Sequence, residues 1–138
     1  MNNIKIFNDV EELTKAFAEF IKTELEDKNS YSIALSGGST PKFIFQYLTK
    51  NYKDSIPWSK INFYWGDERC VPAESNESNY GHAFNLFLNS EKIPKENIHR
   101  IMGEANAKEE TERYSKLIQN NLKSVNNFPQ FDFIMLGL

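Results

Sequence analysis

The pattern of hydrophobic and polar residues changes repeatedly between short apolar runs and longer amphipathic stretches. Short apolar runs occur at residues 4–7, 31–35, 61–65, 98–101 and 131–138, and such runs are typical of strands. The stretches between them repeat apolar side chains every three or four positions, which predicts helices with one buried face. The order of the segments predicts an α/β chain in which strands and helices alternate.

The first helix is expected between the runs at 4–7 and 31–35, and to end near Asp27. Asn8 and Asp9 are both suitable N-cap residues, and acidic residues follow in the first turn, where the helix dipole favours negative charge. Six apolar residues at helical spacing should form its buried face: Val10, Leu13, Phe17, Phe20, Ile21 and Leu25.

Three further helices follow from the same pattern. After the strand at 31–35, Thr40 offers an N-cap with Pro41 as the first helical residue. Ser78-Asn79 can start a helix through Leu88, and residues 107–122 predict an amphipathic helix with a solvated outer face. The inward residues of the first of these three helices should be Phe43, Ile44, Tyr47 and Leu48.

Alternating strands and helices predict a mostly parallel sheet that is covered on both faces. A length of 138 residues is typical of one domain, so residues 1–138 are expected to form a single domain. In sheets of this kind, ligands bind outside the carboxyl ends of the strands. The segments 36–41, 66–69 and 137–138 are expected to lie there.

Composition excludes several classes of function. A net charge of -3 gives no electrostatic reason to bind nucleic acid or an anionic membrane, and no apolar run approaches membrane-spanning length. One cysteine, Cys70, excludes an internal disulfide and a cysteine-built metal cluster, and His, Asp and Glu show no clustered spacing, so no structural metal site is expected. These properties favour a cytoplasmic protein. His82 and His99 are interpreted as surface or packing residues.

A glycine pair joins the strand at 31–35 to the following helix. Adjacent glycines permit a tight turn with positive φ, and the free N–H groups at a helix start favour a phosphate. The loop has neither the Gly-Lys-Ser/Thr ending of a P-loop nor the order of a dinucleotide site, and a plain capped turn is the alternative. The candidate phosphate-binding residues are Gly37, Gly38, Ser39 and Thr40.

The second candidate loop, residues 66–69, follows the strand at 61–65 and contains Asp67-Glu68-Arg69. A carboxylate at a strand end can act as a base or an orienting group, and an arginine can bind an anion with two parallel hydrogen bonds. Because adjacent residues cannot all face one site, we expect Asp67 and Arg69 on one side and Glu68 directed elsewhere. An exposed turn with a local ion pair is the alternative.

Three motifs in order resemble those of 6-phosphogluconolactonases. They are LSGGSTP at 35–41, FYWGDERCVP at 63–72 and SNY at 78–80, and the runs at 93–101 and 131–138 also look like strands of that family. The related glucosamine-6-phosphate deaminases share the glycine-rich loop and the Asp-Glu pair. They usually have tyrosine as the third residue, so Arg69 favours the lactonase branch.

The resemblance implies a Rossmann-like three-layer α/β/α sandwich with a mostly parallel sheet. It also implies hydrolysis of 6-phospho-D-glucono-1,5-lactone to 6-phosphogluconate in the pentose phosphate pathway, without metal or organic cofactor. It implies that the glycine-rich loop contacts the sugar-phosphate substrate and its phosphate, that Asp67 and Arg69 line the catalytic site, and that Asn79 lies nearby as a substrate-binding residue. Two alternatives stay open. One is a deaminase or isomerase, and the other is a sugar-phosphate-binding module without chemistry.

The family's motifs continue beyond those found here. In the family, the strand similar to residues 133–138 runs into a Gly-x-Asp-Gly-His segment, whose histidine activates the attacking water, and this chain ends before it. The resemblance therefore implies the N-terminal portion of a lactonase, truncated at the C-terminus. We expect the 138-residue piece to be inactive, and surfaces exposed by truncation to self-associate.

Overall fold

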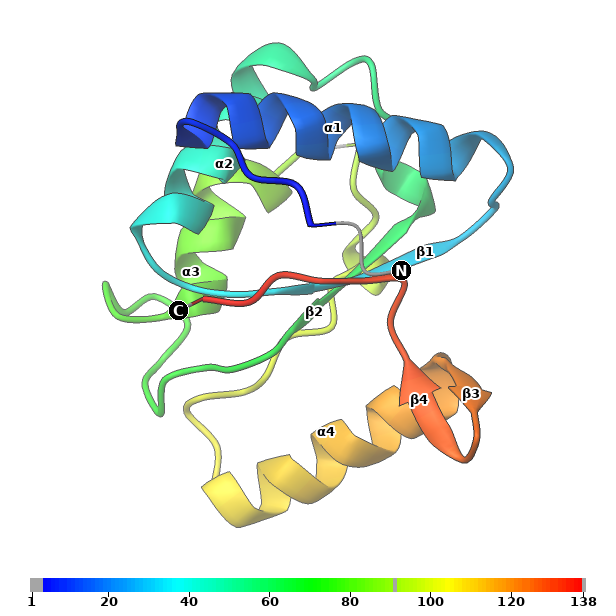
Figure 1. Cartoon of the computed structure of the whole chain (residues 1–138). Coiled ribbons are helices and arrows are strands. Elements are labelled where there is room, and N and C mark those ends of the chain that lie inside the picture. Colours follow the sequence, from blue (N-terminus) through cyan, green and yellow to red (C-terminus); the bar gives the residue numbers. More distant parts are fainter. Residues whose placement is uncertain (1–3, 91, 138) are drawn as a thin grey trace.

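The computed structural model describes residues 4–90 and 92–137 of the 138-residue chain (Figure 1). Its helices are α1 Val10–Glu26, α2 Ser39–Asn51, α3 Asn79–Ala83 and α4 Ala107–Asn121, with a π-helical segment η2 Phe84–Leu88 and the 3-10 turns η1 Trp58–Lys60 and η3 Lys95–Asn97. Its strands are β1 Tyr31–Leu35, β2 Ile61–Trp65, β3 Lys123–Val125, β4 Phe128–Gln130 and β5 Phe133–Ile134. No helix of this described part is long and apolar enough to cross a membrane.

The central sheet is parallel, with the strand order β2-β1-β5. Ile33 lies opposite Phe63 on one side and Phe133 on the other, so these three side chains share one face. Ile98 adds a single parallel bridge to Phe63 outside the named strands. The predicted α/β architecture and its parallel sheet are confirmed.

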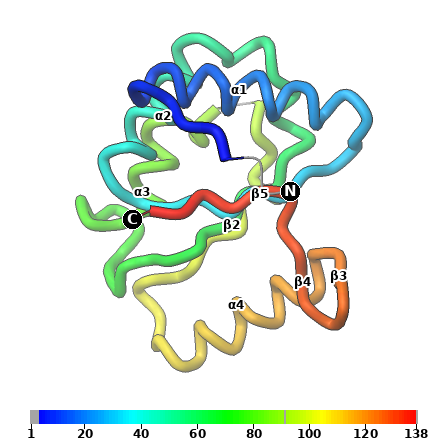
Figure 2. The backbone as a smooth tube through the Cα atoms, viewed as in Figure 1, coloured from blue at the N-terminus to red at the C-terminus, as the bar shows by residue number. Residues whose placement is uncertain are grey.

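The face that carries Ile33 and Phe63 packs against α1, α2 and the continuous α3–η2 helix. Phe133 contacts Phe17 of α1, with ring centroids 5.1 Å apart, and Phe87 of η2 lies edge-on to Phe63 at 5.8 Å. Figure 1 shows α1 on this side of the sheet, and the tube in Figure 2 follows the same path through the chain. The main hydrophobic core lies here.

The opposite face of the sheet is covered by α4 (Figure 1). The hydroxyl of Tyr114 on α4 accepts a hydrogen bond from the backbone N–H of Trp65 at 2.8 Å and donates toward the carbonyl oxygens of Trp65 and His99 at 3.1 and 3.3 Å. His99 also stacks on Tyr64, with centroids 4.5 Å apart. The predicted helix at 107–122 is confirmed, although Leu122 is its C-cap and not its last residue.

The first helix starts after Asp9, one of the two residues predicted as possible N-caps. Asp9 is the N-cap, and its carboxylate accepts the N–H of Glu12 at 2.8 Å. Ile21 and Leu25 are buried as expected, but Phe20 is 44% exposed, because its ring lies at the edge of the helix face beside Phe133. Burial of Phe20 was therefore a wrong prediction.

The start of α2 also differs from the expectation. Gly38 is the N-cap and Ser39 the first helical residue, so Thr40 is not the cap and Pro41 is the third helical residue. The chain turns into the helix at Gly38, whose φ of 114° only glycine adopts readily, and the residues after it are already helical. The buried face uses Phe45, while Phe43 and Tyr47 are only half-buried.

Three predicted strands are absent or shorter. Residues 4–7 form no strand, and Ile4 and Ile6 are 82% and 90% exposed, because no described strand pairs with them. The run at 98–101 is reduced to the bridge at Ile98, and the described part of the other run, 131–137, to β5, since the ladder with β1 is only two residue pairs long. Leu138, which the prediction included, lies outside the described residues. The β3–β4 hairpin was not predicted. Its turn residues Asn126 and Asn127 have positive φ.

Candidate functional site

The two predicted loops meet at the carboxyl ends of β1 and β2. These strands are neighbours in register, with Leu35 opposite Trp65, and the N–H of Gly66 donates to the carbonyl oxygen of Leu35 at 2.9 Å. The parallel pairing therefore brings the loop at 36–41 beside the loop at 66–69. This is the edge of the sheet where α/β proteins bind ligands.

The glycine-rich loop leads directly into the N-terminus of α2. The first intrahelical bond runs from the N–H of Lys42 to the carbonyl oxygen of Gly38 at 3.3 Å, and Pro41 has no N–H. Ser39 and Thr40 are exposed, so their N–H and hydroxyl groups can donate to a ligand. The loop has the donors that a phosphate-binding helix N-terminus requires.

Only one of the two glycines uses positive φ. Gly38 has a φ of 114°, whereas Gly37 does not adopt positive φ. A Cβ atom built on Gly37 would lie 1.9 Å from Oδ1 of Asn79, so the absence of a side chain at Gly37 is required by close packing. The positive φ that the glycine pair permits is therefore used at Gly38, while Gly37 is required by the space that Asn79 occupies.

Asp67 and Asn79 are held together. The side-chain amide of Asn79 donates to the carbonyl oxygen of Asp67 at 3.2 Å and to its Oδ2 at 3.3 Å. Asp67 is exposed, whereas Asn79 is only 5% exposed. Asn79 thus touches both loops, because its amide also lies against Gly37.

Glu68 points away from Asp67, toward the N-terminus of α3. Its carboxylate accepts hydrogen bonds from the N–H groups of Asn79 and Tyr80 at 2.7 and 2.8 Å and from the Ser78 hydroxyl at 3.0 Å. A carboxylate at a helix N-terminus is electrostatically favourable. Sequence reasoning predicted that Glu68 faces elsewhere, but not that it anchors α3. The available signal was an acidic residue, Glu68, that precedes Ser78-Asn79 at the start of the next helix.

Arg69 is exposed, and the described ion pairs include none with Asp67, Glu68 or Arg69. Its backbone is fixed instead. A Cβ atom on Gly103 would lie 2.1 Å from the carbonyl oxygen of Arg69, so the 100–104 segment packs tightly against this loop. The described residues therefore do not form the local ion pair that the alternative interpretation predicted for this turn.

A cavity of about 250 Å³ lies between Arg69 and the start of α4. Its lining includes Cys70, which is exposed and free, and Glu110. The guanidinium of Arg113 donates to Glu110 at 2.6 Å, and this bond is the main reason that the pKa of Glu110 lies below its usual range. Glu110 also accepts the N–H of Met102 at 2.7 Å, which braces the segment behind Arg69.

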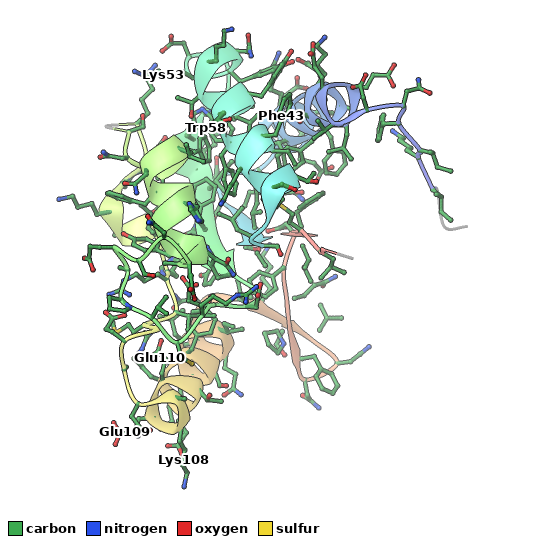
Figure 3. The ribbon with its side chains drawn as sticks, turned by 90° about the vertical axis from the view of Figure 1, so that its left-hand side faces the viewer. Phe43, Lys53, Trp58, Lys108, Glu109 and Glu110 are labelled. Carbon is green, nitrogen blue, oxygen red and sulfur yellow. The ribbon has the colours of Figure 1, made fainter. Side chains whose placement is uncertain are left out.

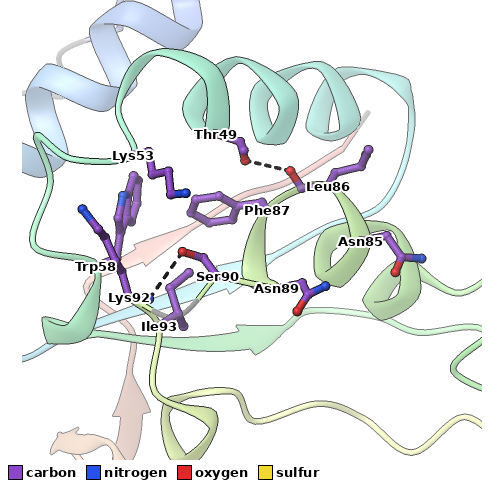
Figure 4. Close-up of a pocket in the computed structure, with 10 residues that line it drawn as sticks. All are labelled: Thr49, Lys53, Trp58, Asn85, Leu86, Phe87, Asn89, Ser90, Lys92 and Ile93. Atoms are coloured by element: carbon purple, nitrogen blue, oxygen red, sulfur yellow. Dashed lines mark hydrogen bonds between the residues drawn. The ribbon is translucent and has the colours of Figure 1, made fainter.

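A larger cavity of about 440 Å³ lies elsewhere, near the C-terminal ends of α2 and η2 (Figure 4). Lys53, Trp58 and Phe87 are among its lining residues, and none of the predicted site residues is. Figure 3 shows Lys53 and Trp58 on one side of the sheet and the first turn of α4 on the other. Helix C-termini present carbonyl oxygens, so the ends of α2 and η2 do not offer the free helix-start N–H groups found at the candidate site.

The two histidines have packing contacts, as their positions predict. Nε2 of His82 lies 2.8 Å from the carbonyl oxygen of Asn76, and Nε2 of His99 lies 3.2 Å from Oδ1 of Asn62. Burial lowers the pKa of His99. Among residues 4–90 and 92–137, no cluster of three or more His, Cys, Asp or Glu side chains is suited to hold a metal ion.

Comparisons with known proteins agree with this geometry. Residues 8–138 match the family described as glucosamine-6-phosphate isomerases/6-phosphogluconolactonase. The chain is 44% identical over 107 residues to 6-phosphogluconolactonase of Haemophilus influenzae, covering 77% of this chain and 44% of that protein. It is 30% identical over 133 residues to 6-phosphogluconolactonase of Treponema pallidum, covering 96% and 55%.

A solved structure shows the same fold. The crystal structure of devB protein superposes with a TM-score of 0.89 at 38% identity, over 94% of this chain and 55% of that one. The chain thus spans about half the length of the relatives that it matches. With a family match that starts at residue 8 and reaches residue 138, this chain belongs to the glucosamine-6-phosphate isomerase/6-phosphogluconolactonase family.

Proposed function

We propose that the whole protein hydrolyses 6-phospho-D-glucono-1,5-lactone to 6-phosphogluconate. It would thus be an enzyme of the pentose phosphate pathway that acts in the cytoplasm. The observation that supports it best is that the α2 N-terminus and the loop carrying Asp67 and Arg69 lie at the ends of adjacent strands, with Asn79 joining Asp67 to the glycine-rich loop. The relatives from Haemophilus influenzae and Treponema pallidum carry the name of this activity. A small anionic sugar ester is the substrate that such a site suits.

In this proposal the α2 N-terminus binds the substrate phosphate. Gly37 and Gly38 let the backbone approach it, and Ser39 and Thr40 supply N–H and hydroxyl donors. Arg69 is exposed on the neighbouring loop, and we propose that it neutralises substrate negative charge. Asp67 orients the reacting part of the lactone. Hydrolysis adds water across the C1–O bond of the ring, so it consumes no redox equivalent, and no cofactor is proposed.

The test is lactone hydrolysis by the whole protein and by Asp67→Asn. Loss of a carboxylate that acts on the reacting group should lower kcat/KM by about 10²-fold or more. Asp54→Asn is the matched control, because Asp54 is an exposed carboxylate paired with Lys92 away from the loops, and it should stay within about twofold of wild type. Hydrolysis no faster than the spontaneous reaction would reject the proposal. Release of ammonia from glucosamine 6-phosphate would instead identify a deaminase.

A second proposal concerns self-association of the 138-residue chain. β5 is an edge strand of the described sheet; Ile134 within it is 50% exposed, and Leu136 just after it is 82% exposed. An open edge with apolar neighbours favours pairing between copies. Size-exclusion chromatography should show an apparent mass that rises with concentration, and Ile134→Lys should suppress the rise. One monomer peak at all concentrations would contradict it.

A further inference from the structure

We propose that Asn79 is a positioning residue, which holds the Asp67 carboxylate beside the glycine-rich loop, and that Gly37 is glycine because the Asn79 amide fills the space of its side chain. The catalytic half of this inference rests on the proposed lactonase function. The packing half rests on the geometry alone. It differs from a direct contact between Asn79 and substrate, which the family motif had suggested.

The hydrogen bonds of the Asn79 side-chain amide are made to groups of the protein. Nδ2 of Asn79 donates to the backbone carbonyl oxygen and to Oδ2 of Asp67, at 3.2 and 3.3 Å. Because both acceptors belong to Asp67, the backbone and the side chain of that residue are tied to one group. A carboxylate accepts and cannot donate when ionised, so the chemistry requires the NH₂ side of the amide to face Asp67.

The other side of the amide faces the glycine-rich loop. A Cβ atom at Gly37 would lie 1.9 Å from Oδ1, 2.4 Å from Cγ and 2.9 Å from Nδ2 of Asn79. All three nearest atoms belong to one side chain, so the steric requirement at Gly37 depends on Asn79. The spacing between the two loops is thereby set by the thickness of one amide group.

The backbone of Asn79 is fixed as well. Glu68 accepts the N–H of Asn79 at 2.7 Å, and the Ser78 hydroxyl that caps α3 donates to the same carboxylate at 3.0 Å. Asn79 is 5% exposed, whereas Asp67, Ser39 and Thr40 are exposed. The exposed groups are available to a ligand, and the buried amide orients one of them.

A double-mutant cycle tests the packing half. We expect Gly37→Ala to lower the folding equilibrium constant by about tenfold or more in the wild-type background, and by less than about threefold when combined with Asn79→Ala. Denaturant unfolding of the 138-residue chain measures both. If Gly37→Ala alone does not fold, recovery of a folded double variant gives the same result. Equal losses in the two backgrounds would overturn the inference.

Kinetics of the whole protein test the positioning half. Asn79→Asp keeps the shape of the side chain and removes the donor, so it should lower kcat about as much as Asn79→Ala, by roughly 10- to 100-fold, with KM for the lactone changed less than about threefold. Neither substitution should lower kcat further once Asp67→Asn is present. A rise in KM with unchanged kcat would overturn positioning and indicate a substrate contact.

The two arms separate this inference from the proposed function. A wild-type protein without lactonase activity rejects the function, while the coupling between Gly37 and Asn79 in unfolding would still be observed. Independent effects at Gly37 and Asn79 reject the inference even where the lactone is hydrolysed. Full activity of Asn79→Asp likewise rejects the positioning role, since that variant retains the shape and lacks the donor.

Discussion

The two faces of the sheet are held by different forces. On one face, α1, α2 and the α3–η2 helix bury aromatic and aliphatic side chains against Ile33, Phe63 and Phe133. On the other, α4 reaches the sheet through the Tyr114 hydroxyl and its bonds to backbone groups of β2. The first face is stabilised mainly by apolar burial, whereas on the second face hydrogen bonds act together with the packing of His99 and Phe131 against Tyr64.

This difference shows why the second face positions the candidate site without a large core. A hydrogen bond has a fixed direction, so Tyr114 sets the register of α4 against Trp65, just before the loop at 66–69. Glu110 then fixes the backbone at Met102 behind Arg69. The main hydrophobic core lies on the first face, while Tyr114 and Glu110 fix the backbone at Trp65 and Met102, close to the loop.

The largest effect is expected on the apolar face. Phe87→Ala should lower the free energy of unfolding by about 3–5 kcal/mol, because the ring contacts Phe45, Trp58 and Phe63 at centroid distances of 4.8 to 6.0 Å and leaves a cavity. Phe128→Ala is the matched control, since that ring is 74% exposed, and should change it by less than about 0.5 kcal/mol. If urea unfolding showed equal losses of stability for Phe87→Ala and Phe128→Ala, the prediction that the apolar face is the main source of stability would be wrong.

A smaller effect is expected at the polar anchor. Tyr114→Phe keeps the ring but leaves the backbone N–H of Trp65 without its acceptor, which should cost about 1–3 kcal/mol. Tyr47→Phe, at a half-buried ring on α2, is the control and should be nearly neutral. If Tyr114→Phe is also neutral in urea unfolding, α4 is held by packing and the two faces do not differ in kind.

The smallest effect concerns pH. Burial lowers the pKa of His99, so the folded protein disfavours the protonated ring more than the unfolded chain does. As pH falls below the ordinary histidine pKa of about 6.5, the unfolded chain binds more protons, and the free energy of unfolding should decrease. His99→Phe keeps a ring to stack on Tyr64 and should flatten this dependence between about pH 7.5 and 5.5. An unchanged pH profile would assign the decrease to other groups.

The apolar face could be predicted from the sequence, and the polar face only in part. Apolar spacing identified α1, α2, β1 and β2, because their stability depends on the same burial that the pattern reports. It failed for residues 4–7, where an alternating run finds no partner strand, and for the β3–β4 hairpin. That hairpin depends on two asparagines in positive φ, a local turn signal that apolar periodicity does not contain.

The candidate site, too, could be predicted from the sequence only in part. The position of both loops was predictable, since parallel strands place their carboxyl ends at one edge. The partners of Glu68 and Asn79 were not, because hydrogen bonds across 11 or 12 residues depend on how α3 returns to the sheet. The different roles of Gly37 and Gly38 could be seen only in the structure. Gly38 is required for its positive φ, and Gly37 because the Asn79 side chain leaves no room for a Cβ atom.

Cys70 makes the loop experimentally accessible. It is the single cysteine of the sequence, its thiol is exposed, and it follows Arg69 directly. A thiol-reactive fluorophore would therefore attach at one place without removal of other cysteines, on the wall of the cavity between Arg69 and α4. Its emission would report whether a sugar phosphate binds near the neighbouring guanidinium, as we propose.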